Sequence, residues 1–330
     1  MINVAVVGMG WWGKTVVNLI QKSSKLRVVA GMNLNAKLDE DFAREHGFHM
    51  VSDYAEVLAD SRVEAVILCT PHSLHKDQII AAARANKHVF CEKPLAMTRD
   101  DVEQALEVIN AHHLQIAVGH ERRFEPPIQE LMRRLKSGLL GVPLHIEANF
   151  SQDKFLTLPL DNWRLSAKEA PGGPLTATGI HILDLSISVF GEAEKLWCSV
   201  KQLGSQLVNG DTLSAMVQFK QGGHALLTAI LATPFDGRFA VYGTKGWIEV
   251  RDKAHPGTPE GWTLTQVLSG GEKTRIEYEP CSSVLVNLEA FADAIDQRAP
   301  YPVPQTQMIA NIAAMEAMIR SAATGEIVSL

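Results

Sequence analysis

Residues 2–13 read INVAVVGMGWWG, a short apolar run followed by three glycines in the spacing GxGxxG. The run is typical of a buried strand, and residues 14–22 have the apolar periodicity of a helix. In such a unit the first glycine permits a tight turn, the second lets backbone approach a pyrophosphate, and the third lets helix and strand pack. Because the helix N-terminus then faces the anion, Gly8, Gly10 and Gly13 predict a dinucleotide site.

Two further features of this site concern its walls and its choice of cofactor. Trp11 and Trp12 are unusual in such a turn, and we expect one to line the cofactor cleft while the other packs against protein. An NAD-preferring fold expects a carboxylate about twenty residues after the last glycine, and Asn33 stands there. An amide can bond a ribose hydroxyl without repelling a 2′-phosphate, and Lys37 lies nearby. The sequence therefore predicts NAD or NADP, with a slight lean toward tolerance of NADP.

The rest of the chain shows two different patterns of predicted strands and helices. Up to about residue 119, strand-like and helix-like segments alternate, which predicts an α/β Rossmann domain with a parallel sheet. Beyond Pro126 and Pro127, period-two segments separated by turn signals predict an α+β domain with a large, mostly antiparallel open sheet. We therefore expect an NAD(P)-binding Rossmann domain at 1–122 and a substrate-binding and oligomerisation domain at 123–330.

Composition limits the classes of partner. The chain has 330 residues, 46% of them hydrophobic and 21% charged, and a formal net charge of -6. This charge gives no electrostatic reason to expect nucleic acid or an anionic membrane as a partner. Met1 leads within two residues into the first strand, which leaves no room for a signal peptide, and no apolar run is long enough to span a membrane. We therefore predict a cytoplasmic protein.

A second motif, Glu92-Lys93-Pro94, follows the apolar run Val89-Phe90-Cys91. Ligands of a doubly wound sheet bind outside the carboxyl ends of its strands. The amine of Lys93 is therefore expected beside the nicotinamide ring, with Glu92 and Pro94 on the cofactor side.

The segment after the strand that ends at Cys69 is expected at the same edge of the sheet. Its residues Thr70, Pro71, His72 and His75 are predicted to form the floor of the cofactor site. A metal site at the two histidines is disfavoured because the sequence offers no third ligand to go with them, so we predict no metal.

The order of these motifs resembles the glucose-fructose oxidoreductase and inositol dehydrogenase family, often called Gfo/Idh/MocA. The likeness runs through TPHSLHKDQIIAAARANKHVFCEKPLA, VGHERRFEPP, NWRLSAKEAPGGPLTATGIHILD and YGTKGWIEV, and so covers nearly the whole chain. It implies that Lys93 is the active-site lysine and His181 the histidine of the substrate domain, with Asp184 on the same helix face. Sugar dehydrogenases of the family often carry an aspartate four residues before the histidine, where this chain has Ala177.

The chemistry of alcohol oxidation assigns roles to these residues. When a hydride leaves a secondary alcohol, its oxygen must lose a proton, so a base and a hydrogen-bond donor must flank it. We assign His181 as the proton acceptor and Lys93 as the donor. The reverse stays open, since burial and a positive nicotinamide would lower the pKa of Lys93. An acid beside His181 would raise its basicity, and Ala177 cannot, so Lys93 is expected to carry more of the chemistry.

Further residues are expected to line a cleft between the domains. Arginines suit carboxylates or phosphates through paired hydrogen bonds, but they suit structural ion pairs equally well. The substrate candidates are Arg123, Trp163, Arg164, Thr178 and Asp184.

The sequence thus predicts an NAD(P)-dependent oxidoreductase that acts on a CH–OH group of a small polyhydroxylated or cyclic substrate, such as a sugar, an inositol or a derivative. The resemblance also implies a homodimer or homotetramer associated through the open face of the antiparallel sheet. One alternative is a dihydrodiol or other non-sugar dehydrogenase, which Ala177 makes reasonable. Another is a non-catalytic dinucleotide-binding sensor.

Overall fold

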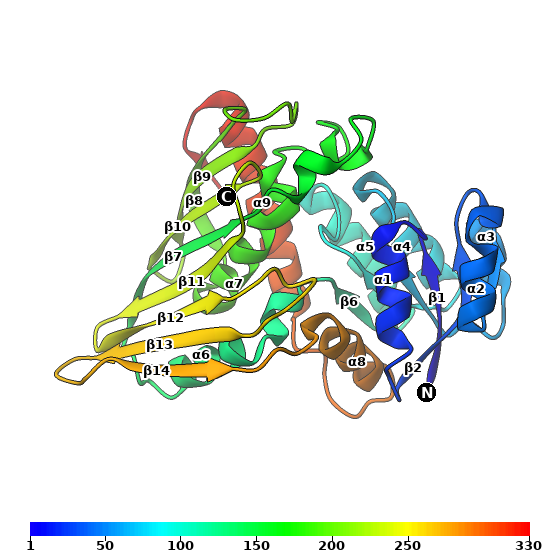
Figure 1. Cartoon of the computed structure of the whole chain (residues 1–330), viewed down its shortest axis with the longest axis horizontal. Coiled ribbons are helices and arrows are strands. Elements are labelled where there is room, and N and C mark those ends of the chain that lie inside the picture. The colour runs from blue at the N-terminus through cyan, green and yellow to red at the C-terminus, as the bar shows by residue number, and fades with distance from the viewer. The chain divides into compact units, whose positions relative to one another are not determined.

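The computed structural model describes residues 1–330, which form two compact units (Figure 1). Unit 1 comprises Met1–Glu121 and Val284–Met308, and unit 2 comprises Arg122–Ser283 and Ile309–Leu330. The predicted division at residues 122 and 123 did not include this return of the chain. It arises because helix α8 (Ser283–Ile295) buries Val284, Leu288 and Phe291 in the apolar core of unit 1.

Unit 1 is built on a six-stranded parallel sheet in the order β3-β2-β1-β4-β5-β6. This confirms the predicted Rossmann fold, and the strand order reverses between β1 and β4. The strands are β1 Ile2–Val7, β2 Leu26–Met32, β3 His49–Val51, β4 Ala65–Leu68, β5 His88–Cys91 and β6 Ile116–Val118. The helices besides α8 are α1 Trp11–Ile20, α2 Glu40–His46, α3 Tyr54–Ala59, α4 His75–Arg84 and α5 Arg99–Ala111, with 3-10 turns η1 Ala36–Asp39 and η2 His72–Leu74.

Local signals account for two helix starts in unit 1. Thr98 caps α5 because its hydroxyl oxygen accepts a bond from the backbone N–H of Asp101 at 3.2 Å, the bond that is typical of a threonine with an acidic residue three positions later. Helix α1 begins at Trp11 rather than at the predicted residue 14. The reason is that Gly10 is already the extended N-cap residue, so Gly13 lies inside the first turn, where helix and strand pack.

Unit 2 is built on a nine-stranded sheet in the order β14-β13-β12-β11-β7-β10-β9-β8-β15. Only β10 and β7 pair in parallel, which confirms the predicted, mostly antiparallel sheet. The strands are β7 Pro143–Ser151, β8 Ala193–Lys201, β9 Thr212–Phe219, β10 His224–Ile230, β11 Asp236–Gly243, β12 Gly246–Asp252, β13 Trp262–Leu268, β14 Thr274–Tyr278 and β15 Val328–Ser329.

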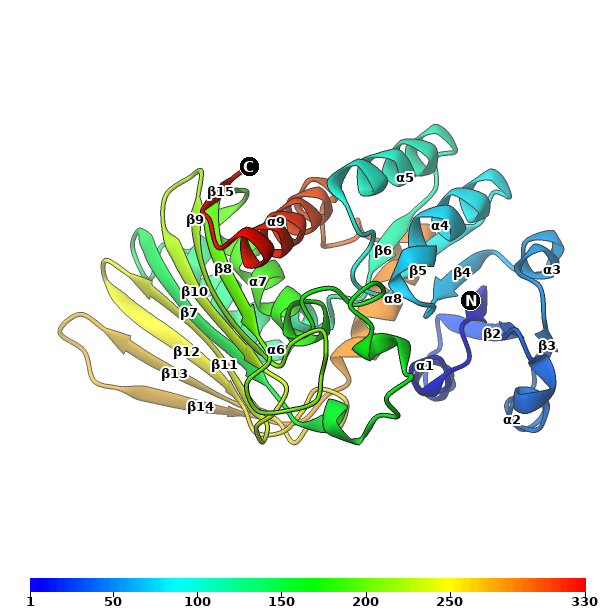
Figure 2. The same ribbon diagram turned by 90° about the horizontal axis from the view of Figure 1, so that it is seen from above.

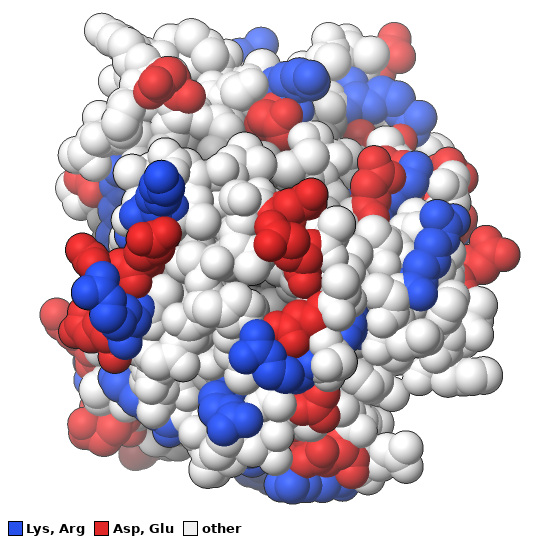
Figure 3. All heavy atoms as spheres, turned by 90° about the vertical axis from the view of Figure 1, so that its right-hand side faces the viewer, with Lys and Arg blue, Asp and Glu red and all other residues white.

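Helices cover one face of this sheet and leave the other bare (Figure 2). They are α6 Pro126–Lys136, α7 Ile180–Phe190 and the part of α9 (Gln305–Thr324) that belongs to unit 2; shorter turns are η3 Glu121–Phe124, η4 Lys154–Thr157, η5 Trp163–Leu165 and the π-helical turn η6 Leu175–Gly179. None of the helices is both long and apolar enough to cross a bilayer. The face drawn in Figure 3 carries acidic and basic side chains interspersed, without a broad area of one sign.

Candidate functional site

In the glycine turn between β1 and α1, the backbone leaves no room for a side chain at two of the glycines but leaves open space at the third. Gly8 has a φ of +95°, and a Cβ there would lie 2.7 Å from the carbonyl oxygen of Cys69. A Cβ on Gly13 would collide with the carbonyl oxygen of Gly8. At Gly10, in contrast, a Cβ would meet no protein atom within 4 Å. The open side of Gly10 is therefore a cradle that fits a dinucleotide pyrophosphate approaching the backbone.

This contrast predicts that Gly10→Val folds normally but binds NADH at least about 10-fold more weakly, because the added side chain fills the cradle. Gly10 has φ -69° and ψ -172°, a conformation open to any residue, so we expect at most about 1 kcal/mol lost in unfolding free energy from the poorer N-cap. Chemical denaturation and NADH fluorescence titration measure the two effects. Gly8→Val is the control and should lose stability as well. Wild-type affinity in Gly10→Val would refute the cradle.

The carboxylate of Glu92 organises the backbone that leads into Lys93. It accepts a bond from the indole Nε1 of Trp12 at 2.7 Å and one from the backbone N–H of Lys93 at 3.3 Å. A Cβ on Gly119 would lie 2.6 Å from one oxygen of Glu92, so this glycine makes room for the carboxylate. Trp12 is half-buried, whereas Trp11 is 66% exposed. Sequence reasoning missed Gly119, although its place directly after β6 was a usable signal.

His75, the first residue of α4, is fully buried and joins the loops that follow β4 and β5. Its Nδ1 lies 2.7 Å from the carbonyl oxygen of Pro94, and its Nε2 lies 3.0 Å from that of Thr70. Burial lowers the pKa of His75, opposed by the contacts with Pro94 and Thr70. Because the neutral ring has one N–H, only one contact is a donated bond. These contacts join the loop at Thr70 to the loop that contains Lys93 and Pro94.

The other predicted floor residues lie close to this connection. His72 is buried in turn η2, directly after Pro71, and its ring centroid lies 5.9 Å from that of His75. The hydroxyl of Thr70 donates to Oε1 of Gln78 at 2.6 Å. No group of three histidine, cysteine, aspartate or glutamate side chains is placed to hold a metal ion.

At the predicted adenosine end, Asn33 follows β2 directly. Its side-chain N–H donates to Oδ2 of Asp39 at 2.6 Å, and the other oxygen of Asp39 pairs with Nζ of Lys14 at 2.7 Å. Asp39 is 2% exposed. Sequence reasoning missed it because it lies within the acidic run Asp39-Glu40-Asp41, in which nothing distinguishes one carboxylate from another.

In unit 2, His181 is the second residue of α7 and is buried. The π-helical turn η6 precedes α7, and such turns are frequent at functional sites. The ring of His181 packs on Phe150 of β7 with 5.8 Å between centroids. Thr178, also buried, donates its hydroxyl to the carbonyl oxygen of Pro174 at 3.4 Å.

Two predicted substrate residues of unit 2 bind each other. Nε and Nη2 of Arg123 each lie 2.6 Å from an oxygen of the Asp184 carboxylate, and Nη2 also donates to the backbone carbonyl of Asp184 at 3.2 Å. Their side chains are 10% and 2% exposed. This bidentate ion pair ties the segment just after the unit boundary to the helix that carries His181.

Trp163 and Arg164 lie on turn η5, with the guanidinium 4.3 Å from the centre of the indole ring. The side chain of Asn209 holds the turn by donating to the backbone carbonyl of Arg164 at 3.0 Å. Ala177 packs against an apolar cluster centred on Leu165, Leu207 and Leu231. The position at which the resemblance leads us to expect an aspartate therefore contributes an apolar side chain to this cluster.

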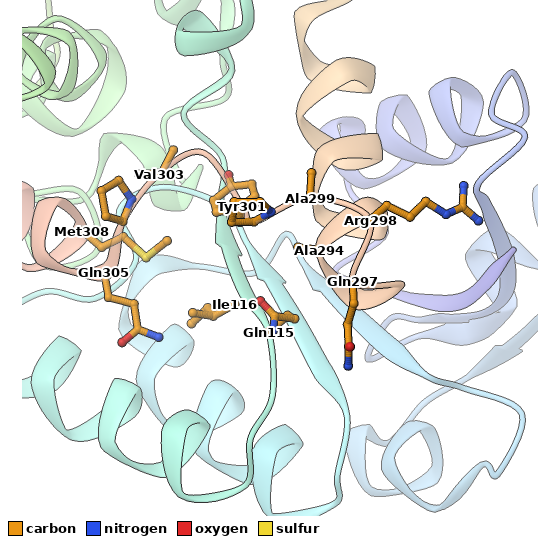
Figure 4. Close-up of a pocket in the computed structure, with 12 residues that line it drawn as sticks. Gln115, Ile116, Ala294, Gln297, Arg298, Ala299, Tyr301, Val303, Gln305 and Met308 are labelled. Atoms are coloured by element: carbon orange, nitrogen blue, oxygen red, sulfur yellow. The ribbon is translucent and has the colours of Figure 1, made fainter.

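A hollow of about 490 Å³ in unit 1 does not coincide with these residues (Figure 4). Gln115 and Ile116 line it at the start of β6, together with Tyr301, Val303 and Met308. Because ligands of a doubly wound sheet bind at the carboxyl ends of the strands, we do not assign this hollow to the cofactor.

Comparison with known proteins matches both units. The family profile described as "Oxidoreductase family, NAD-binding Rossmann fold" matches residues 2–120, and that of the GFO/IDH/MocA C-terminal domain matches residues 128–249. Scyllo-inositol 2-dehydrogenase (NAD(+)) from Bacillus subtilis is 32% identical over 269 residues, which cover 77% of this chain and 75% of that protein.

Two further likenesses span almost the whole chain. 1,5-Anhydro-D-fructose reductase from Ensifer adhaerens is 29% identical over 304 residues, which cover 91% of this chain and 90% of the relative. The solved structure of aldose-aldose oxidoreductase from Caulobacter crescentus, complexed with glycerol, has a TM-score of 0.88 at 23% identity and covers 100% of this chain and 99% of that one. At this identity the structural likeness shows a shared fold.

Proposed function

Because the chain belongs to the GFO/IDH/MocA family of NAD(P)-dependent oxidoreductases, we propose that it transfers a hydride between nicotinamide and a secondary alcohol or ketone of a small polyhydroxylated or cyclic substrate. The observation that carries the proposal is the place of Lys93. It follows β5, at the same sheet edge as the glycine turn after β1, and β4 lies between the two strands. A dinucleotide cradled at Gly10 extends along this edge in the doubly wound fold.

The chain's own residues supply the acid–base part of the reaction. When bound, the nicotinamide accepts or supplies the hydride. The ammonium group of Lys93 donates a hydrogen bond to the substrate oxygen and stabilises the charge that develops there. The imidazole of His181 accepts the proton of the alcohol. Glu92 and His75 hold the backbone on either side of Lys93, through the Lys93 N–H and the Pro94 carbonyl.

The apolar side chain of Ala177 favours a second candidate within the same chemistry. Phe155 and Leu158 pack on the cluster that Ala177 joins, and Ala177 itself offers no carboxylate to a sugar hydroxyl. A dihydrodiol or another substrate with fewer hydroxyl groups would suit it better.

A substrate panel separates these candidates. The enzyme is mixed with NAD or NADP and with D-xylose, myo-inositol, scyllo-inositol or a trans-dihydrodiol, and nicotinamide absorbance is followed; 1,5-anhydro-D-fructose is tested with the reduced cofactors. Turnover of the sugars or inositols supports the first proposal, and turnover of the dihydrodiol alone supports the second. Cofactor binding without turnover of any compound would favour a dinucleotide-binding sensor.

We further propose that the bare face of the unit 2 sheet joins two copies of the chain. Trp197, Met216 and Leu226 lie side by side on β8, β9 and β10 and are 38%, 48% and 46% exposed. On the same face, the rings of Tyr242 and Trp247 lie 6.3 Å apart. The three apolar side chains on β8, β9 and β10 form a patch of a kind that is typical of an interface, and a self-complementary sheet face suits a twofold dimer.

Charges placed on this face are expected to separate the copies. The double variant Met216→Glu, Leu226→Glu should run as a smaller species than wild type in size-exclusion chromatography with light scattering, because two carboxylates would face an apolar partner. Leu160→Glu, which changes a 76% exposed leucine outside the sheet, is the control and should keep the wild-type mass. A monomeric wild type, or an unchanged mass of the double variant, would refute this interface.

A further inference from the structure

We infer that Asp39 makes the site select NAD over NADP, by fixing the orientation of the Asn33 side chain. The inference rests on the proposed dinucleotide cofactor and goes beyond it by naming the residue that decides between the two forms. These forms differ only at the adenosine ribose, where one has a 2′-hydroxyl and the other a 2′-phosphate. The discriminating residues must therefore lie near the end of β2.

Asn33 occupies that place. Strands β1 and β2 pair in parallel so that Val7 lies opposite Met32, and the N–H of Gly8 donates to the carbonyl oxygen of Met32 at 2.9 Å. The residue after Met32 therefore lies at the carboxyl edge of the sheet, beside the start of the glycine turn.

Asp39 determines which atom of the Asn33 amide faces this edge. An ionised carboxylate only accepts hydrogen bonds, so the contact of 2.6 Å must be made by Nδ2 of Asn33. The flipped amide would place Oδ1 against the carboxylate oxygen, and the two would repel. Asp39 is 2% exposed, which keeps water from replacing this bond. The amide oxygen Oδ1 is thus left as an acceptor on the other side.

The fixed orientation favours a hydroxyl over a phosphate. Oδ1 can accept a hydrogen bond from a ribose hydroxyl, as the carboxylate of other NAD sites does. The oxygens of an ionised 2′-phosphate are acceptors, so Oδ1 has no bond to offer them. The ammonium group of Lys14 forms an ion pair with Asp39, with 2.7 Å between Nζ and Oδ1. Turn η1 carries one basic side chain, the exposed Lys37.

Fluorescence titration with NADH and NADPH tests the inference without any substrate. Wild type should bind NADH at least about 10-fold more tightly than NADPH. Asp39→Asn lets the Asn33 amide flip and releases Lys14, so it should lower this ratio at least about 5-fold, mainly through tighter NADPH binding. Asn33→Ser leaves Asp39 in place and provides a hydroxyl that can donate, so it should lower the ratio even if Asp39→Asn fails to fold.

Lys22→Ala, at an exposed lysine just beyond the C-terminal end of α1, is the control and should leave the ratio within about 2-fold of wild type. Equal or tighter binding of NADPH by wild type would overturn the inference. So would an unchanged ratio in both folded Asp39→Asn and Asn33→Ser, or a change in Lys22→Ala as large as theirs. Failure to bind either nucleotide would instead refute the proposed function.

Discussion

Replacing Lys93 with methionine is expected to lower kcat by about 10²- to 10⁴-fold, the range typical of a lost proton-transfer or charge-stabilising group. Methionine keeps an unbranched stem but has no ammonium group. NADH affinity should stay within about 3-fold of wild type, because Glu92 holds the backbone N–H of residue 93 and His75 contacts the Pro94 carbonyl. Steady-state rates with the best substrate of the panel and NADH titration provide the two values.

Lys76→Met is the matched control for this variant. Lys76 lies on α4 and pairs with Asp101 at 2.8 Å, outside the lysine loop. Its replacement should leave kcat within about 2-fold of wild type, since a partly exposed ion pair contributes little. If Lys93→Met retained most of the wild-type kcat, Lys93 would have no place in the chemistry.

Replacing His181 with asparagine is expected to lower kcat/KM for alcohol oxidation by about 10²- to 10⁴-fold through loss of the general base. The pH profile separates the two possible assignments of the base. If neutral imidazole accepts the proton, wild-type activity rises with pH across the range in which an imidazole loses its charge, and His181→Asn abolishes this rise. His224→Asn, at the exposed first residue of strand β10, is the control and should keep both the rate and the profile.

The opposite result has a definite meaning. A rise that survives in His181→Asn but disappears in the residual activity of Lys93→Met would make the lysine amine the base. Full activity of His181→Asn would remove His181 from the mechanism.

Features encoded by short segments could be predicted from the sequence. The turn after β1 could be predicted from the glycines of INVAVVGMGWWG, because such a turn requires glycine where backbone atoms leave no room for a side chain. The structure shows this at Gly8 and Gly13. Thr98 and Asp101 predict their capping bond because it spans three residues. The position of Lys93 could be predicted from strand order alone, since the residues that follow each parallel strand lie at the same edge of the sheet.

Features that depend on distant pairing could not be predicted. Arg123 and Asp184 are 61 residues apart, and each alone suits a substrate as well as an ion pair. The return of α8 to unit 1 depends on the fit of Phe291 against Phe90, whose ring centroids lie 5.9 Å apart, and no local pattern reports this contact.

Hydride transfer itself can be followed by labelling the substrate carbon. The enzyme is incubated with oxidised cofactor and the best alcohol of the panel, deuterated at the carbinol carbon, and the cofactor is then analysed by mass spectrometry. A hydride moves between the substrate carbon and nicotinamide without exchange with water, so the reduced cofactor should carry one deuterium for each molecule of ketone formed. Consumption of the alcohol with an unlabelled cofactor, or with the deuterium found in water, would contradict this account of the protein.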